Sequence, residues 1–339
     1  MTELNNIALK IISNGQGILA ADESTATMTK RLENVNVESN SHNRLIFREA
    51  LFSSSSMKDC IGGVILYDET IRQSSTKGCK ISELISESNA VTGIKVDTGA
   101  KTLANSTQEK ITEGLDGLRE RLKEYYKLGA RFTKWRGVYT ISNIYPSKLS
   151  IVSNAHALAR YSALAQESGM VPIVEPEVLM DGHHTAEDCL KVTSEVLKVC
   201  FEQLEIHKID LKGIILKPNM ILPGSNSDKK ISNEEIAKLT LKCLKDNVPT
   251  EVPGIAFLSG GQTEIEASRN LNQINLINDT NFLITFSYGR ALQQSALKTW
   301  SKDTKNVSKV QEVFNHRAKM NGLSSKGAWS ENLEKEIAA

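Results

Sequence analysis

The chain has 339 residues, of which 40% are hydrophobic, so it can bury a large core in one domain or in two. Its 41 basic and 40 acidic side chains give a net charge of +1. A nearly neutral chain has no global field to attract nucleic acid or an anionic membrane, so we expect neither partner and look for anion binding at local sites.

The cysteines and the N-terminus suggest a cytoplasmic protein. The five cysteines are odd in number and lack the paired short spacings of a zinc site or a disulfide framework, so we expect reduced core thiols. The first residues carry no basic segment followed by an apolar segment, and no apolar run reaches membrane-spanning length. We therefore expect a cytoplasmic location.

Short apolar runs alternate with segments of helical spacing along the chain. The runs lie at residues 17–22, 61–68, 93–97, 130–136, 170–177, 213–220, 254–261 and 282–290. Helical patterns lie at residues 7–13, 28–32, 43–52, 115–128, 151–168, 186–204, 233–245, 263–275, 291–300 and 307–319. This alternation predicts an α/β fold, a single (β/α)8 TIM barrel over residues 1–322 that begins with a short N-terminal helix. Residues 323–339 are expected to form a polar C-terminal tail.

Charged side chains end several of these runs. In a (β/α)8 barrel the parallel strands all direct their C-terminal ends to one mouth, so we expect these charges to converge there. They are Asp22, Lys95, Asp97, Lys134, Arg136, Glu175, Glu177, Lys217 and Arg290, with Arg31 just behind. A doubly wound open sheet is the competing architecture, but it would gather ligand residues mainly at one crevice.

Lys217 ends the apolar run 213–220 and is followed by a proline, which fits the end of a buried strand. A lysine at such a place loses preference for its charged form, and a free amine attacks a carbonyl to form a Schiff base. The alternative is that Lys217 extends into water, as most strand-ending lysines do.

Two glycine-containing loops predict a phosphate site. Residues 258–261 (LSGG) and 287–290 (SYGR) end the seventh and eighth runs, where this fold commonly binds phosphate. Glycines let backbone amides approach an anion, and Arg290 offers a planar fork to its oxygens. Alternatively, the loop is a tight turn and Arg290 a surface ion pair. Lys95 with the hydroxyls of Ser24 and Thr27 predicts a second, weaker anion site.

Glu175 and Glu177 share one face of a strand because strand side chains alternate. They could be the paired carboxylates of a glycosidase, but they lie one above the other along a single strand rather than across a ligand. We prefer Glu175 as a single general acid or base. His183 and His184 are adjacent and cannot easily meet one ion, so no metal site is expected.

Six motifs together resemble class I fructose-1,6-bisphosphate aldolases, in that family's order and spacing from about residue 7 to residue 319. They are residues 18–25 (ILAADEST), 93–97 (GIKVD), 171–177 (VPIVEPE), 216–220 (LKPNM), 258–262 (LSGGQ) and 287–292 (SYGRAL). The resemblance implies a Schiff-base lyase without metal or other cofactor. It would reversibly cleave fructose 1,6-bisphosphate into dihydroxyacetone phosphate and glyceraldehyde 3-phosphate. It also implies phosphorylated ketose and triose substrates and a cytosolic homotetramer.

The resemblance assigns a role to each motif residue. Lys217 would form the imine, with Lys134 beside it to position oxygen atoms. Asp22 would take the proton of the C4 hydroxyl, and Glu175 would handle the protons of carbinolamine formation and loss, with Glu177 next to it. The phosphate on the ketose side would be held by Ser259, Gly260, Gly289 and Arg290. The other end would be held by Ser24, Thr27, Lys95, Arg31 and Arg136.

The tail departs from the family pattern. Animal-type members end in a mobile tail whose terminal tyrosine exchanges protons, whereas the last tyrosine here is Tyr288. The glutamates Glu331, Glu334 and Glu336 are expected to be solvated, and Trp329 to anchor the tail by packing. We therefore expect a barrel group, Glu175 first, to protonate the enamine.

Three alternative functions stay open from the sequence. The first is a Schiff-base lyase for a related sugar phosphate such as sedoheptulose bisphosphate. The second is a hydrolase that uses Glu175 and Glu177, and the third is a binding protein that keeps the barrel without turnover.

Overall fold

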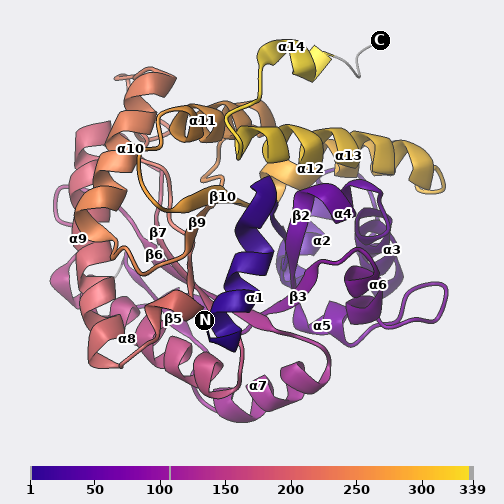
Figure 1. Ribbon diagram of the computed structural model, residues 1–339, viewed down its shortest axis with the longest axis horizontal. Helices are drawn as coiled ribbons and strands as arrows, with labels where there is room; N and C mark the ends of the chain where they lie inside the picture. Colours follow the sequence, from indigo (N-terminus) through magenta and orange to yellow (C-terminus); the bar gives the residue numbers. More distant parts are fainter. Residues whose placement is uncertain (1, 107, 336–339) are drawn as a thin grey trace.

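Eight parallel strands close into a barrel in the computed structural model, which describes residues 2–106 and 108–335 (Figure 1). Their order around the barrel is β1-β10-β9-β8-β7-β6-β3-β2, which confirms the TIM-barrel prediction. The strands are β1 (Gly17–Ala21), β2 (Ile61–Leu66), β3 (Val91–Lys95), β6 (Phe132–Tyr139), β7 (Val171–Val178), β8 (Ile215–Leu216), β9 (Gly254–Phe257) and β10 (Leu283–Tyr288). Strands that are consecutive in the barrel lie side by side, so their C-terminal ends form one rim.

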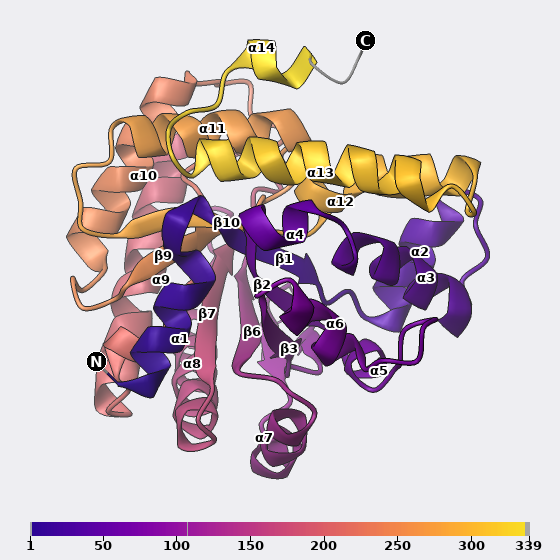
Figure 2. The same ribbon diagram turned by 45° about the vertical axis from the view of Figure 1, so that its right-hand side comes forward.

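Helices surround the barrel, as the alternating pattern predicts. The helices between and after the strands include α2 (Thr25–Glu33), α3 (Ser41–Phe52), α6 (Ile81–Glu87), α7 (Leu118–Lys127), α8 (Lys148–Glu167), α9 (Ala186–Ile206), α10 (Asn233–Asn247), α11 (Glu264–Leu276), α12 (Arg290–Lys302) and α13 (Val307–Ser324). Side-chain caps start several of them: Ser147 caps α8, while Thr185 and Thr263 form capping boxes on α9 and α11. Helix α13 packs against α11 and α12 (Figure 2).

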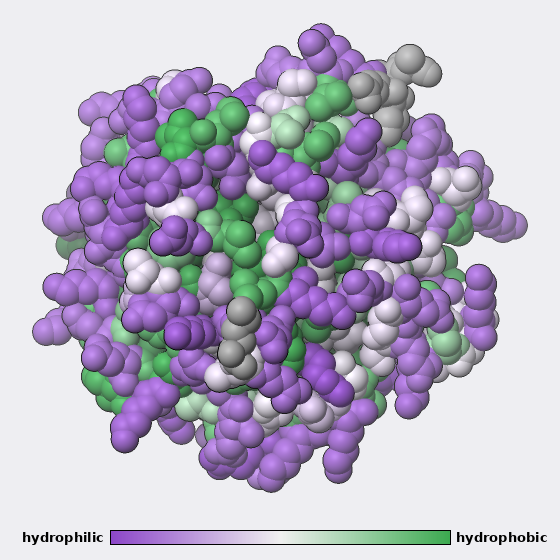
Figure 3. Space-filling model, in the orientation of Figure 1, coloured by the Kyte–Doolittle hydropathy of each residue, from purple (hydrophilic) through white to green (hydrophobic). Residues whose placement is uncertain are grey.

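The N-terminal helix α1 (Glu3–Ile12) closes the N-terminal end of the barrel (Figure 1). Ala8, Ile11 and Ile12 join a buried apolar cluster inside the barrel that includes Ile65 and Phe132. The approach is so close that a Cβ on Gly62 would lie 2.0 Å from the Ile11 carbonyl oxygen. Hydrophilic side chains cover most of the face that carries α1, with apolar residues showing between them (Figure 3). This end of the barrel is therefore a sealed apolar core.

Some elements differ from the sequence prediction. Helix α2 begins at Thr25, three residues earlier than expected, because Ser24 caps it and accepts from Thr27 N at 3.3 Å. Strand β8 has just two residues and ends before Lys217. The sequence pattern did not predict the two-stranded sheet of β4 (Gly99–Thr102) and β5 (Lys110–Glu113). It also missed the short helices α4 (Ser56–Cys60), α5 (Asp68–Ile71) and α6, and the 3-10 turns at Ser13–Gly15 and Leu211–Gly213.

The C-terminal segment is anchored after α13, and the division of the chain at residue 322 stays a prediction. Trp329 is buried, as expected for an anchor, and its Nε1 donates to Glu334 Oε1 at 2.6 Å. Glu334 lies in the short helix α14 (Glu331–Glu334). The expectation that it is solvated is wrong, because Arg317 of α13 also pairs with it at 2.5 Å. Glu331 is exposed but pairs with Arg269, and Glu336 lies outside the described residues.

Two further sequence expectations meet mixed outcomes. All five cysteines are free, but Cys60 and Cys79 are partly exposed, so the expectation of core thiols holds for Cys189, Cys200 and Cys243. Among residues 2–106 and 108–335, no helix is both long enough and apolar enough to cross a membrane.

Candidate active site

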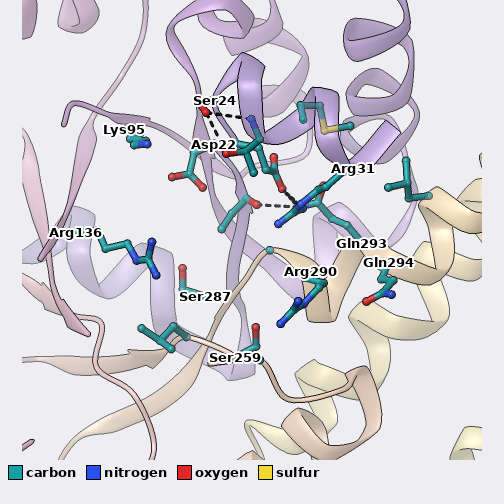
Figure 4. Close-up of a pocket in the computed structure, with 18 of the residues that line it drawn as sticks. Asp22, Ser24, Arg31, Lys95, Arg136, Ser259, Ser287, Arg290, Gln293 and Gln294 are labelled. Atoms are coloured by element: carbon teal, nitrogen blue, oxygen red, sulfur yellow. Dashed lines mark hydrogen bonds and ion pairs between the residues drawn. The ribbon is translucent and has the colours of Figure 1, made fainter. Parts of the chain in front are cut away.

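A cavity of about 670 Å³ lies at the C-terminal ends of the strands and holds every site residue predicted from the sequence (Figure 4). Those residues are Asp22, Ser24, Thr27, Arg31, Lys95, Lys134, Arg136, Glu175, Glu177, Lys217, Ser259, Gly260, Gly289 and Arg290. They come from strand ends and loops spread over the whole chain, so the convergence expected from parallel strands occurs.

Lys217 and Glu175 form a buried ion pair. The backbone N–H of Lys217 donates to the Val174 carbonyl at 2.8 Å, which continues the β7–β8 pairing one residue past β8. This pairing sets Lys217 beside Glu175, and the Nζ atom lies 3.0 Å from Glu175 Oε1. Both residues are buried, with relative exposures of 4% and 3%. The amine therefore has a carboxylate within proton-transfer distance.

Lys134 is surrounded by carboxylates. Its Nζ lies 2.8 Å from Asp22 Oδ2, 3.3 Å from Glu175 Oε2 and 4.0 Å from Asp97 Oδ2. Asp97 also pairs with Lys95 at 3.4 Å, which links the centre of the site to the rim. Asp22, Lys134, Glu175 and Lys217 are thus one connected group of buried charges.

Lys134 and its carboxylate partners Asp22 and Glu175 favour one another's ionised forms. Burial works to lower the pKa of Lys134, but the negative charges of Asp22, Glu175 and Asp97 outweigh it and raise the pKa above the usual lysine range. Burial likewise works to raise the pKa of Asp22 and of Glu175, but Lys134 and then Lys217 lower both below their ordinary values. Lys134 is therefore a fixed cation, and Asp22 and Glu175 are carboxylates in their ionised form.

Glu177 lies further out along the same face of β7 and has a different partner. Arg136 Nε donates to Glu177 Oε2, and no ion pair joins Glu177 to Lys217 or Lys134 in the described part of the chain. Burial works to lower the pKa of Arg136, but Glu177 raises it above the usual arginine range. Glu175 and Glu177 therefore belong to separate pairs, unlike the two carboxylates of a glycosidase.

The loop after β9 lines the cavity with Ser259, Gly260 and Gly261. Gly260 and Gly261 adopt φ of 53° and 81°, a region that favours glycine. Gln262 fixes the loop by donating from Nε2 to the Ser259 carbonyl at 2.8 Å. Helix α12 begins beside it at Arg290, and its N-cap Gly289 supplies no side-chain cap. Open amides, a helix N-terminus and a guanidinium together suit a phosphate group.

The first loop of the barrel supplies a second polar group of side chains. Ser24 Oγ and Thr27 Oγ1 lie 3.1 Å apart at the start of α2. Lys95 and Arg136 lie across the cavity from Arg31 and Arg290 (Figure 4). The Arg31 guanidinium pairs with Glu23, a partner that the sequence did not suggest.

Several cavity residues were missed. Glu23, Gln293, Gln294 and Ser287 line the cavity, and Glu23 is buried with an exposure of 7%. A glutamate in a loop is usually solvated, so nothing in the sequence singled out Glu23. Gln293 lies three residues after Arg290, one helical turn along α12, and this spacing could have identified it.

A metal site is not formed by the described residues. Among residues 2–106 and 108–335, no group of three or more His, Cys, Asp or Glu side chains is arranged to hold a metal ion. The carboxylates of Asp22, Asp97 and Glu175 do converge, but the ammonium of Lys134 lies among them.

Comparison with known proteins identifies the family. The family model described as glycolytic, fructose-bisphosphate aldolase class-I, matches residues 3–339. A probable fructose-bisphosphate aldolase class 1 from Xanthomonas campestris pv. campestris is 47% identical over 328 residues, 96% of this chain and 98% of the relative. Fructose-bisphosphate aldolase 6, cytosolic, from Arabidopsis thaliana is 48% identical over 96% of this chain and 91% of the relative.

A solved structure of similar fold belongs to the same family as these relatives. Fructose-bisphosphate aldolase from Plasmodium falciparum, crystallised with TRAP and a small-molecule inhibitor, superposes with a TM-score of 0.95. It shares 44% sequence identity and covers 97% of this chain and 95% of its own. The chain therefore belongs to the class I fructose-bisphosphate aldolases, metal-independent lyases that reversibly cleave fructose 1,6-bisphosphate into dihydroxyacetone phosphate and glyceraldehyde 3-phosphate.

Proposed function

We propose that Lys217 is the residue that forms the imine with the substrate ketone. The observation that carries this proposal is the 3.0 Å contact between Lys217 Nζ and Glu175 Oε1. Glu175 can accept a proton from the ammonium and so release the free amine that attacks the carbonyl. Lys134 is a poor candidate for the same step because its carboxylate neighbours raise its pKa and keep it protonated.

Glu175 then serves as the proton carrier of imine formation. The attack of the amine on the ketone gives a carbinolamine, whose hydroxyl leaves as water once it is protonated. The proton that Glu175 took from Lys217 is available for this step, so one carboxylate acts as base and then as acid. We propose the same residue as proton donor to the enamine, because its carboxylate lies beside the amine on which the enamine would form.

Asp22 is the proposed base for cleavage of the carbon bond. Its carboxylate lies 2.8 Å from the fixed cation Lys134, which keeps it ionised and ready to accept the C4 hydroxyl proton. As that proton leaves, the C3–C4 bond breaks and its electron pair moves toward the imine. Lys134 and Glu177 are proposed to orient the substrate oxygens.

The phosphate groups are proposed to bind at opposite ends of the cavity. Ser259, Gly260, Gly289 and Arg290 would bind the phosphate on the ketose side. The other end would use Ser24, Thr27, Lys95, Arg31 and Arg136. We also propose a cytoplasmic homotetramer, by analogy with the family. Sedoheptulose 1,7-bisphosphate is the competing substrate and would be separated by comparing kcat/KM for the two sugars.

Borohydride trapping tests the assignment of Lys217. Reduction in the presence of dihydroxyacetone phosphate should attach the substrate irreversibly, and peptide mass spectrometry should place the adduct on Lys217. The Lys217→Met variant should show no adduct. An adduct on Lys134 or Lys95 would refute the assignment, and a hydrolase that uses Glu175 and Glu177 would show no adduct and would keep its activity in Lys217→Met.

A further inference from the structure

Arg48 is a buried cation that the proposed mechanism leaves without a role. It lies on α3 with an exposure of 1%, outside the set of residues that line the cavity. Its Nη2 donates to the Glu23 carbonyl at 2.9 Å and lies 3.4 Å from Glu23 Oε2, while Nη1 donates to Thr70 Oγ1 at 2.8 Å. A fully buried charge is costly to keep, so its retention calls for an explanation.

Glu23 connects Arg48 to the cavity. Its carboxylate accepts from Arg48, from Arg31 and from Gln293 Nε2, the last at 3.2 Å. Gln293 Nε2 also donates to the Ala20 carbonyl at 2.7 Å, which ties the group to the end of β1. Arg31, Glu23 and Gln293 all line the cavity, and Arg31 is the more exposed member of its ion pair, with a side-chain exposure of 28% against 5% for Glu23.

The charges of this group explain what Arg48 does. One carboxylate faces two guanidinium groups, which leaves a net charge of +1 by the sum of one negative and two positive groups. Without Arg48 the carboxylate would neutralise Arg31 completely, and a substrate phosphate would have to compete with Glu23 for it. With Arg48 present, Glu23 fixes the position of Arg31 while the positive charge at the cavity wall is kept.

We propose that Arg48 is a positioning residue, a buried counter-cation that balances Glu23 so that Arg31 keeps its charge for a substrate phosphate. The inference rests on the proposed role of Arg31 as a phosphate contact. It assigns a function to Arg48, which is buried outside the set of residues that line the cavity.

Four variants test the proposal through KM for fructose 1,6-bisphosphate. Arg48→Met should raise KM about tenfold, with kcat changed by less than about threefold, because substrate affinity is lost while the catalytic group is intact. Arg48→Lys keeps the charge and should stay near wild type. Adding Glu23→Gln to Arg48→Met removes the unbalanced carboxylate, and KM should return to within about threefold of wild type. Glu23→Gln alone removes the charge that competes for Arg31 and keeps an amide oxygen to hold it, so KM should rise less than in Arg48→Met.

A matched control separates this effect from a loss of packing. Arg44 lies one turn earlier on α3, is also buried and pairs with Glu69 at 2.5 Å, but Glu69, unlike Glu23, does not line the cavity. Arg44→Met should lower the urea midpoint without raising KM. A merely structural role for Arg48 predicts that the double variant is no better than Arg48→Met, and that result would overturn the proposal.

The proposed function has its own control. Arg31→Met should raise KM for the bisphosphate, and an unchanged KM would show that Arg31 does not bind phosphate, which overturns both ideas. If Arg31→Met raises KM but Arg48→Met does not, the counter-cation proposal alone fails. If Arg48→Met does not fold, Glu23→Gln decides the matter, because a tenfold rise in its KM would contradict the proposed charge balance.

Discussion

The two ends of the barrel interior are built from the same strands, but one end carries apolar side chains and the other carries charged side chains. On β7 the inward face reads Val171 and Ile173 near the N-terminal end, then Glu175 and Glu177 near the mouth. On β6 it reads Phe132 and then Lys134. Because side chains alternate with a period of two, one strand contributes first to the apolar core and then to the charged site.

The difference shows where stability and chemistry reside. At the N-terminal end, α1 seals an apolar cluster, and removal of apolar surface from water favours folding. At the mouth, four buried charges are connected through Lys134 and Glu175, and buried ion pairs contribute little net stability. We therefore expect substitutions at the mouth to change activity and substitutions at the opposite end to change stability.

The largest expected effect is the loss of activity in Lys217→Met. Without an amine there is no imine and no electron sink, so kcat/KM should fall by about 10⁴ or more. A coupled assay for triose phosphate release measures it. Lys95→Met is the matched control, because it should weaken phosphate binding but still form the imine. Comparable losses in the two variants would contradict a special role for Lys217.

Phe132→Ala should lower the stability of the protein and leave its activity nearly unchanged. The Phe132 ring fills the barrel interior against Gly63 and Gly93, where an added Cβ would come within 3.1 and 2.3 Å of it. Its removal leaves a cavity that nearby glycines cannot fill, so unfolding should become easier by about 3 to 5 kcal/mol. Urea unfolding measures the loss. At a temperature where the variant is folded, kcat should stay within about threefold of wild type, and a larger fall would show that the two ends are coupled.

Arg290→Ala should raise KM for fructose 1,6-bisphosphate by one to two decades. Loss of a charged phosphate contact typically costs about 1.5 to 3 kcal/mol. An unphosphorylated ketose should be affected less. If KM rises equally for both substrates, Arg290 supports the fold and not phosphate binding.

Acid should destabilise the mouth through Asp22 and Glu175. Their pKa values are lower in the folded state than in the unfolded state, so their stabilising contribution is present above about pH 4 and is lost as the pH falls toward the folded values. Lys134 has the opposite sign, since its raised pKa gives a contribution that is lost only at high pH. As the pH falls from 5 to 3, the linkage through Asp22 should lower the free energy of unfolding by about 1 kcal/mol. Urea midpoints for Asp22→Asn should fall less over this range, and an identical fall would show that Asp22 is not involved.

Deletion of residues 324–339 should have the smallest effect. The segment holds Trp329 and Glu334 in structural contacts and contains no tyrosine. Exchange of the dihydroxyacetone phosphate C3 proton should therefore change by less than about tenfold, or about 1.4 kcal/mol of barrier. A drop of several decades with carbon bond cleavage spared would show that the tail carries the proton.

The sequence was most informative where a pattern had one geometric consequence. Alternation on β7 predicted that Glu175 and Glu177 share a face, and the proline after Lys217 predicted the strand end. It could not reveal that Glu177 pairs with Arg136 and Glu175 with Lys217, because cross-strand pairing depends on barrel register. Glu23 and Arg48 are 25 positions apart in the chain, and neither lies in a local pattern that marks a buried pair.

The contacts of Glu334 and the small sheet were missed for a similar reason. Glu334 is held by Arg317 and Trp329, and these contacts exist only once α13 has formed. Strands β4 and β5 are short, and most of their residues are exposed, so they lack the apolar run by which the barrel strands were recognised.

The most direct test of the division between the two ends is the urea unfolding of the double variant Lys217→Met, Glu175→Gln. It replaces the buried ion pair at the centre of the site with neutral side chains of similar size. Because such pairs add little net stability, the free energy of unfolding should equal or exceed that of wild type, although the variant is inactive. A fall of about 3 kcal/mol or more would show that the charged mouth also stabilises the fold and would contradict the division.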